Sequence, residues 1–308
     1  MGITFHFLNV GSGDCTIVHF PQRRRKDGTI KDERVMMVDL NSDEQNDELE
    51  NVIDYFKKHF HDSSGNIMPI FRFVCTHPHH DHICGLQKLV ADSDIRLLNF
   101  WDLEHSFEPE DFSGHPTHRD DWEAYLRLRK SESSPKVIRT SREDSPRLYW
   151  DDNEDRISIL SPSKNLVRHA HYTEDGSRRS STDVEIDEMS YALVIQINDR
   201  KVLLAADGRE SPFWDDVIEN CEDQIHDCCV LKAGHHGHEA GFSSEAVRSI
   251  TPEYVIFSNS SSEDRDHGAA DKYAKSCPSA TILKTCDEGT IVLDVPFDVD
   301  EEISIKRS

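Results

Sequence analysis

Residues 73–86, FVCTHPHHDHICGL, place four histidines and one aspartate within six positions, directly behind an apolar run. The segment 70–77 is rich in aromatic and β-branched residues and predicts a strand, and apolar spacing predicts a helix over about 82–91. A loop that is merely histidine-rich and solvated would not need an apolar strand before it and an apolar helix after it. The stretch therefore predicts a strand, a tight turn and a helix built around a metal site.

The spacing inside the turn divides the ligands into two pairs. His77 and His79 alternate, so both side chains can face one cation, and Asp81 and His82 can face a second cation beside it. Imidazole nitrogen and carboxylate oxygen without cysteine suit zinc and manganese alike. We predict two divalent metal ions at this turn.

Three other predicted strands end on residues of the same chemistry. KVLLAADG ends on Asp207, VLKAGHHG ends on His235 and His236, and RVMMVDLN ends on Asp39. A carboxylate at Asp207 is predicted to bridge the two metals, and Asp39 to accept the second N–H of a ligand histidine. His235 is assigned to the metal and His236 to protonation of the leaving group, although the spacing leaves the reverse assignment open.

The remaining apolar segments form two blocks of strands, each accompanied by helices. This pattern predicts an α/β fold of two packed sheets flanked by helices, in a single domain over 1–308. Polar excursions are expected at about 105–135 and 163–187, the second with a composition typical of disorder. ATILKT and GTIVLDV are predicted to close the chain as a hairpin around CDEG.

Composition restricts the partners. The formal net charge of −24 repels nucleic acid and anionic membranes at long range. No apolar stretch approaches twenty residues and no signal-peptide pattern precedes residue 3, so a cytoplasmic protein without membrane contact is expected. The eight cysteines include no CxxC pair, which favours free thiols over disulfides.

The order of these motifs resembles the metallo-β-lactamase superfamily, and within it the hydrolase domain of ComEC-type competence proteins and the phosphorylcholine esterases. FLNVGSGDCTIVHF is similar to that group's LDVGQGDA opening, THPHHDHICGL to THPHxDHxGGL with Cys84 in place of a glycine, and VLKAGHHG to LKxxHHGS. ISILSP, MSYALVIQI, YVIFSNSSSEDRDHG and KTCDEGTIVL are similar to further segments of the group.

The resemblance implies a four-layer αββα fold and a binuclear metal centre. It places Asp14 in support of the ligands, Lys232 and His267 at the rim near an anionic oxygen, and Ser190 on a family serine that contacts substrate. The extra ligand histidine that many members carry in a GHTxG turn is missing, so the His77/His79 metal is expected to be completed by Asp207 and water. The histidines of the polar excursions are expected at the surface: His105, His115, His118, His169 and His171.

The implied reaction is hydrolysis by a hydroxide that bridges two cations, with Asp81, His236 and Lys232 as catalytic residues. Similarity to the ComEC-type domain favours a nuclease that acts on nucleic acid, and an effector that works with a partner protein is one form of this reading. A small-molecule hydrolase acting on a phosphodiester, a cyclic nucleotide or a lactone is the alternative, and it agrees better with the acidic surface. A non-catalytic scaffold with the same fold is the third reading. Oligomeric state is not indicated by any heptad or long amphipathic helix.

Overall fold

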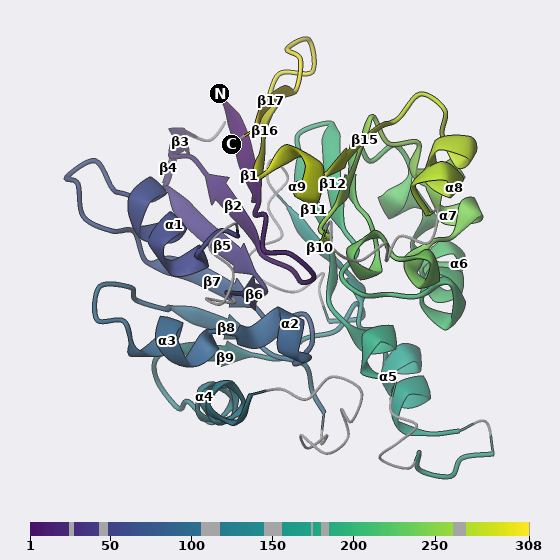
Figure 1. Cartoon of the computed structure of the whole chain (residues 1–308), viewed down its shortest axis with the longest axis horizontal. Coiled ribbons are helices and arrows are strands. Elements are labelled where there is room, and N and C mark those ends of the chain that lie inside the picture. Colours follow the sequence, from purple (N-terminus) through teal and green to yellow (C-terminus); the bar gives the residue numbers. More distant parts are fainter. Residues whose placement is uncertain are drawn as a thin grey trace.

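The computed structural model describes residues 1–24, 28–42, 49–105, 118–144, 156–173, 175–179, 185–260 and 269–307. Within these ranges, two large mixed sheets lie between two groups of helices (Figure 1). The first sheet has the strand order β17-β16-β1-β2-β5-β7-β8-β9 and the second has the order β10-β11-β12-β13-β14-β15. A third, two-stranded sheet pairs β3 with β4.

The strands are short. Those of the first sheet are β1 (Gly2–Phe7), β2 (Thr16–Phe20), β5 (Arg34–Val38), β7 (Ile70–Val74), β8 (Asn99–Trp101), β9 (Lys136–Ile138), β16 (Ile291–Pro296) and β17 (Ser304–Arg307). Those of the second are β10 (Ile157–Ser161), β11 (Ala192–Ile197), β12 (Arg200–Leu204), β13 (Val230–Lys232), β14 (Tyr254–Phe257) and β15 (Thr281–Lys284). The small strands are β3 (Arg23–Arg24), β4 (Ile30–Lys31) and β6 (Leu40–Asn41).

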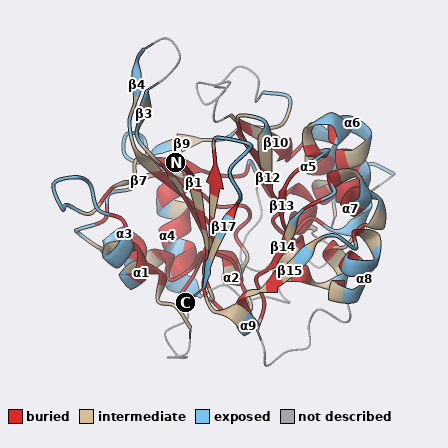
Figure 2. Cartoon of the chain, turned by 90° about the horizontal axis from the view of Figure 1, so that it is seen from above, coloured by how far each residue is buried: buried red, intermediate tan, exposed pale blue. Residues whose placement is uncertain are grey.

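Helices cover the outer face of each sheet. Figure 2 shows one group beside the first sheet and the other on the far side of the second. The first group is α1 (Val52–His59), α3 (Leu86–Ala91) and α4 (Arg119–Arg129), and the second is α5 (Lys164–His171), α6 (Asp215–Ile225), α7 (Ser244–Ile250) and α8 (Ala269–Ser276). Short helical turns connect the strands: α2 (His80–Ile83), η3 (Ile186–Met189), η4 (Glu210–Trp214), η5 (His235–Gly237), η6 (Glu239–Gly241) and α9 (Thr285–Glu288).

Alternation along the strands of the second sheet decides which side chain faces which layer. Successive strand residues point to opposite faces. In β11, Leu193, Ile195 and Ile197 join the core that the two sheets share, whereas Ala192 and Val194 pack in the separate core under α6, α7 and α8. The second sheet is therefore buried on both faces, which explains why its strands read as continuous apolar runs.

The helix predicted over about 82–91 is divided in two by Gly85. This glycine has φ +89, and an added Cβ would lie 3.0 Å from the Cβ of Ser42. The left-handed conformation is inexpensive for glycine and ends α2 before α3 begins. The break leaves α2 as a single turn that carries Asp81 and His82.

The predicted closing hairpin is wrong. β15 pairs in parallel with β14 in the second sheet, and β16 pairs antiparallel with β1 in the first. The CDEG segment lies at α9, which carries the chain from one sheet to the other. Two strand-like segments that are adjacent in the sequence predict a hairpin, but here each segment pairs with a strand of a different sheet.

The second polar excursion is partly helical. α5 buries Leu166 and Ala170, and η3 buries Ile186 and Met189, while 174 and 180–184 lie outside the described residues. Of the first excursion, 106–117 lie outside them and α4 follows directly. Among the described helices, none is long and apolar enough to cross a membrane.

Candidate metal centre

The site lies where strand ends from both sheets meet. β5 and β7 run parallel in the first sheet, and β12 and β13 run parallel in the second. Asp39 and His77 follow the first two strands, and Asp207 and His235 follow the other two. Because carboxyl ends of parallel strands share one edge of a sheet, four distant chain segments converge on one place.

One group of ligand-type atoms contains His77, His79 and Asp187. Asp187 Oδ1 lies 3.1 Å from His79 Nδ1 and 3.6 Å from His77 Nε2, and the two imidazole nitrogens are 2.8 Å apart. Asp187 was not predicted from the sequence, because it lies in the second polar excursion; Asp207 and water were expected to complete the His77/His79 site. In the sequence, Asp187 lies between the HxHxDH motif and Asp207, where many members of the resembling superfamily carry the extra ligand histidine.

A second group contains Asp81, His82 and His236. His236 Nε2 lies 3.1 Å from Asp81 Oδ2, and His82 Nε2 lies 3.9 Å from the same oxygen. The structure thus groups His236 with Asp81 and His82, the reverse of the predicted assignment. His235 is oriented differently: its Nε2 is 4.0 Å from Asp207 Oδ2, and a quarter of its side chain is exposed.

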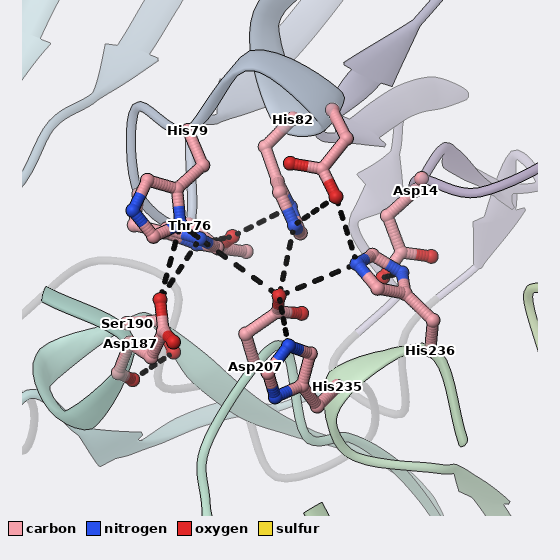
Figure 3. A network of polar contacts seen from close by, with 12 residues as sticks. Asp14, Thr76, His79, His82, Asp187, Ser190, Asp207, His235 and His236 are labelled. Atoms are coloured by element: carbon pink, nitrogen blue, oxygen red, sulfur yellow. Dashed lines mark hydrogen bonds and ion pairs between the residues drawn. The ribbon is translucent and has the colours of Figure 1, made fainter. Parts of the chain in front are cut away.

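Asp207 lies between the two groups (Figure 3). Its Oδ2 is 3.2 Å from His82 Nε2, 3.3 Å from His236 Nε2 and 3.9 Å from His77 Nε2. The side chain is 3% exposed. One carboxylate therefore faces imidazoles of both groups, as expected of a residue that bridges two cations.

Asp39 contacts two residues of the histidine turn. Its carboxylate accepts hydrogen bonds from Thr76 N at 2.7 Å and Thr76 Oγ1 at 2.7 Å, and lies 2.8 Å from His82 Nδ1. Burial raises the pKa of Asp39, and His82 opposes that shift. The contact with Nδ1 leaves His82 Nε2 directed toward Asp207, so Asp39 fixes the orientation of this ring.

Lys232 was predicted at the rim and is instead buried. Its side chain is 3% exposed, and Nζ lies 2.7 Å from Asp14 Oδ2. Asp14 Oδ2 is also 3.4 Å from His236 Nδ1. Burial would raise the pKa of Asp14, but Lys232 and His236 lower it to about 2. The buried pair supports His236, and the prediction that Lys232 acts on substrate is wrong because the ammonium cannot reach solvent.

Ser190 and Arg209 hold the Asp187 turn. Ser190 is fully buried, and its Oγ donates to the Asp187 backbone carbonyl at 2.7 Å, so its predicted contact with substrate is also wrong. Arg209 donates to Asp187 Oδ2 from Nη2 at 2.6 Å and from Nε at 3.1 Å. This fork leaves Asp187 Oδ1 facing the two histidines. The predicted His267 lies outside the described residues.

The backbone is strained at the site. Asp39, Ala206, His235 and His236 all have positive φ, between 46° and 59°. Residues other than glycine rarely adopt this region, and such strain gathers at functional sites where the surrounding structure enforces it. Here the strained residues follow three strands, β5, β12 and β13, where the chain enters the centre.

The residues present fit divalent cations. Buried oxygens Asp187 Oδ1 and Asp207 Oδ1 and nitrogen His236 Nε2 make no hydrogen bond in the described structure. Burial would lower the pKa of His236, but Asp207, Asp14 and Asp81 raise it well above its ordinary value. Burial and the neighbouring imidazoles lower the pKa of His77. Such a buried collection of unsatisfied acceptors and imidazoles is what a cation site requires.

The excursion histidines lie outside this centre, so far as the structure describes them. His105 was predicted at the surface but is buried. Its Nε2 lies 2.7 Å from the Tyr125 hydroxyl, which donates a hydrogen bond to Asp102. His171 Nδ1 lies 2.8 Å from the Val167 carbonyl on α5. His115 lies outside the described residues.

Comparisons with known proteins place the fold. Neither the scan against protein-family models nor the search of curated proteins gave a match. The metallo hydrolase Igni18 from the hyperthermophilic archaeon Ignicoccus hospitalis is similar over 95% of this chain and 100% of its own, with TM-score 0.51 and 12% identity. The metallo-beta-lactamase fold protein YhfI from Bacillus subtilis is similar over 91% of this chain and 96% of its own, with TM-score 0.47 and 11% identity. Zinc-bound PqqB from Methylobacterium extorquens is similar over 94% of this chain and 100% of its own, with TM-score 0.46 and 9% identity.

Structural similarity at sequence identities this low indicates a shared fold and does not indicate a shared substrate. The architecture agrees with the similarity to Igni18, because two mixed sheets pack face to face with helices on both outer faces. The histidine turn follows β7, and the bridging aspartate follows β12. This chain has the metallo-β-lactamase fold, as its motifs predicted.

Proposed function

We propose that this protein is a metal-dependent hydrolase that cleaves phosphodiesters. The observation that carries the proposal is the position of Asp207, whose Oδ2 lies within 4.0 Å of imidazole nitrogens from both ligand groups. A shared carboxylate between two histidine and carboxylate groups is the arrangement of two-metal hydrolytic sites.

The ligands divide between two zinc or manganese ions. His77, His79 and Asp187 would hold the first cation. Asp81, His82 and His236 would hold the second, and Asp207 is shared. When bound, the cations supply a water of lowered pKa and positive charge against the phosphate oxygens.

The chain's own residues position this centre and contact the substrate. Arg209 orients Asp187, and Asp39 orients His82. The Lys232–Asp14 pair contacts Nδ1 of His236, the ring nitrogen that faces away from Asp81. His235 has the exposure to contact an incoming substrate at the edge of the centre, so it replaces His236 as the residue expected to assist the leaving group.

Nucleic acid is the first substrate to test, because the motifs resemble the ComEC-type domain. A specific observation favours small phosphodiesters as the second candidate: the net charge of −24 opposes the many phosphate contacts that an extended nucleic acid needs. A long polymer would need a local cationic surface, whereas a small diester needs only the two cations. The two substrates therefore make different demands on the same centre.

The test is cleavage by the full chain loaded with manganese or zinc. Single- and double-stranded DNA and RNA are compared with a chromogenic phosphodiester, using wild type, Asp81→Ala and Asp94→Ala. Asp94 is 60% exposed and lies outside the centre, so its variant controls for the loss of one carboxylate. We expect Asp81→Ala to lose cleavage and Asp94→Ala to retain it.

Substrate size then decides the class. Cutting of polymers establishes a nuclease, and cutting of the small diester alone establishes a small-molecule phosphodiesterase. If wild type fills the centre with cations but cleaves neither kind of substrate, phosphodiester hydrolysis is the wrong reaction. Lactone hydrolysis and the non-catalytic scaffold are the readings that would then remain.

A further inference from the structure

A second cluster of metal-binding side chains lies beside the centre and is not part of it. The ligand atoms of His80, Cys84 and His118 all lie within 4.8 Å of one another. The imidazole rings of His80 and His118 are 4.3 Å apart between centroids. None of the three belongs to the ligand groups described above, and Cys84 stands where the resembling family has glycine.

The sequence spacing separates the two sets of ligands on one helical turn. His80 is the first residue of α2 and Cys84 is its C-cap residue, so the two lie at opposite ends of a single helical turn with their ligand atoms within 4.8 Å. His82, two residues from each, points the opposite way, toward Asp207 at 3.2 Å. One turn of helix therefore presents ligands of the binuclear centre on one side and this cluster on the other.

A buried carboxylate fixes the third residue in place. Asp121 Oδ2 accepts a hydrogen bond from Gly85 N at 3.1 Å, and its Oδ1 accepts one from Gln87 N at 2.9 Å. Asp121 lies in the first turn of α4, and His118 immediately precedes that helix. The contact therefore holds the start of α4 against the start of α3, which directly follows α2, and keeps His118 near His80.

We propose that His80, Cys84 and His118 form a separate site for one zinc ion. Two imidazoles and a thiolate select zinc over magnesium, calcium or manganese. Cys84 is 6% exposed, which shields the thiolate, while His118 is exposed and leaves a fourth position open to water. The ion ties α4 to α2 and so stiffens the turn that carries Asp81 and His82. This site does not depend on the reaction proposed above.

Cobalt substitution distinguishes this site from the binuclear centre. The centre offers only nitrogen and oxygen ligands, so a thiolate-to-cobalt charge-transfer band reports on Cys84. The metal-free full chain is titrated with Co²⁺, and the band is followed in wild type, Cys84→Ser, His118→Ala and Asp81→Ala. Cys286→Ser is the matched control, because Cys286 is a partly exposed thiol outside the cluster. Bound zinc per chain is measured in parallel by mass spectrometry.

We expect the band in wild type, Cys286→Ser and Asp81→Ala, and its loss in Cys84→Ser with one zinc ion fewer per chain. His118→Ala changes an exposed residue and should weaken cobalt binding at this site at least about tenfold. If Cys84→Ser does not fold, His118→Ala decides the question. A wild type that fills the centre without showing the band, or a band that His118→Ala leaves unchanged in strength and affinity, overturns the proposal. Loss of phosphodiesterase activity alone leaves it standing.

Discussion

Replacing Lys232 by methionine tests whether this lysine is structural. The Lys232–Asp14 pair is joined over 2.7 Å, with both side chains under 10% exposed. Removing one partner of a buried pair leaves an uncompensated charge and costs about 3–5 kcal/mol. The lowering of the Asp14 pKa from 3.8 to about 2 corresponds to about 2 kcal/mol. Lys232 is the largest of the groups that lower this pKa, and His236 and His82 contribute the rest.

The measurement is urea unfolding of metal-free Lys232→Met, followed by fluorescence. We expect a loss of about 2–5 kcal/mol in the free energy of unfolding. Adding Asp14→Asn to the same chain should restore at least about 1 kcal/mol, because it removes the buried charge left behind. A substrate-contacting lysine at the rim would instead leave unfolding unchanged.

Lys57→Met is the matched control. Lys57 Nζ lies 2.6 Å from Asp92 Oδ2, a distance similar to that of the buried pair, but the lysine side chain is 29% exposed. Exposed pairs contribute little, so its unfolding should remain close to wild type. Equal destabilisation by both methionine variants, or no recovery in the double variant, would refute the burial reasoning.

Three further outcomes are expected. Asp39→Ala should weaken cation binding about 10- to 100-fold in competition with a chromogenic chelator, because His82 loses its orienting partner. An unchanged affinity would contradict this role of Asp39. Asp187→Ala should lower the bound metal by about one ion per chain, whereas Asp94→Ala should bind as much metal as wild type. If Asp187→Ala binds as much metal as wild type, Asp187 is not part of the centre. Burial, with His19 and His59 nearby, lowers the pKa of the half-buried His6 from 6.5 to about 3. Between these two values the unfolded chain binds one more proton than the folded chain, so stability falls as the pH falls. His6→Asn should therefore flatten the pH dependence of urea unfolding by about 1 kcal/mol per pH unit in this window, and an unchanged slope would argue against a neutral His6 in the folded chain.

Local patterns were sufficient for the turn and the layers. The HxHxDH spacing after an apolar strand placed His77, His79, Asp81 and His82, and Asp207 was expected from its position at a strand end. The structure brings these residues together because parallel strands carry their carboxyl ends to one edge of a sheet.

Residues that depend on distant partners were beyond local patterns. Asp187 lies on the short helical turn η3, within a polar segment, and the local signal is that it stands between the buried residues Ile186 and Met189. Lys232 at a strand end has the same local appearance whether it faces solvent or a buried aspartate 218 positions away. The choice between His235 and His236 depends on two consecutive left-handed residues.

The sequence by itself determined the layered α/β fold, the histidine turn and the strand ends at which the aspartates and histidines of the centre lie. Tertiary structure alone decided which atoms meet. It exchanged the roles expected for two adjacent histidines, brought Asp187 to the first ligand group and buried Lys232 against Asp14. The physical reason is that periodicity and spacing are properties of neighbouring residues, whereas burial and charge pairing depend on segments that become neighbours only when the two sheets pack.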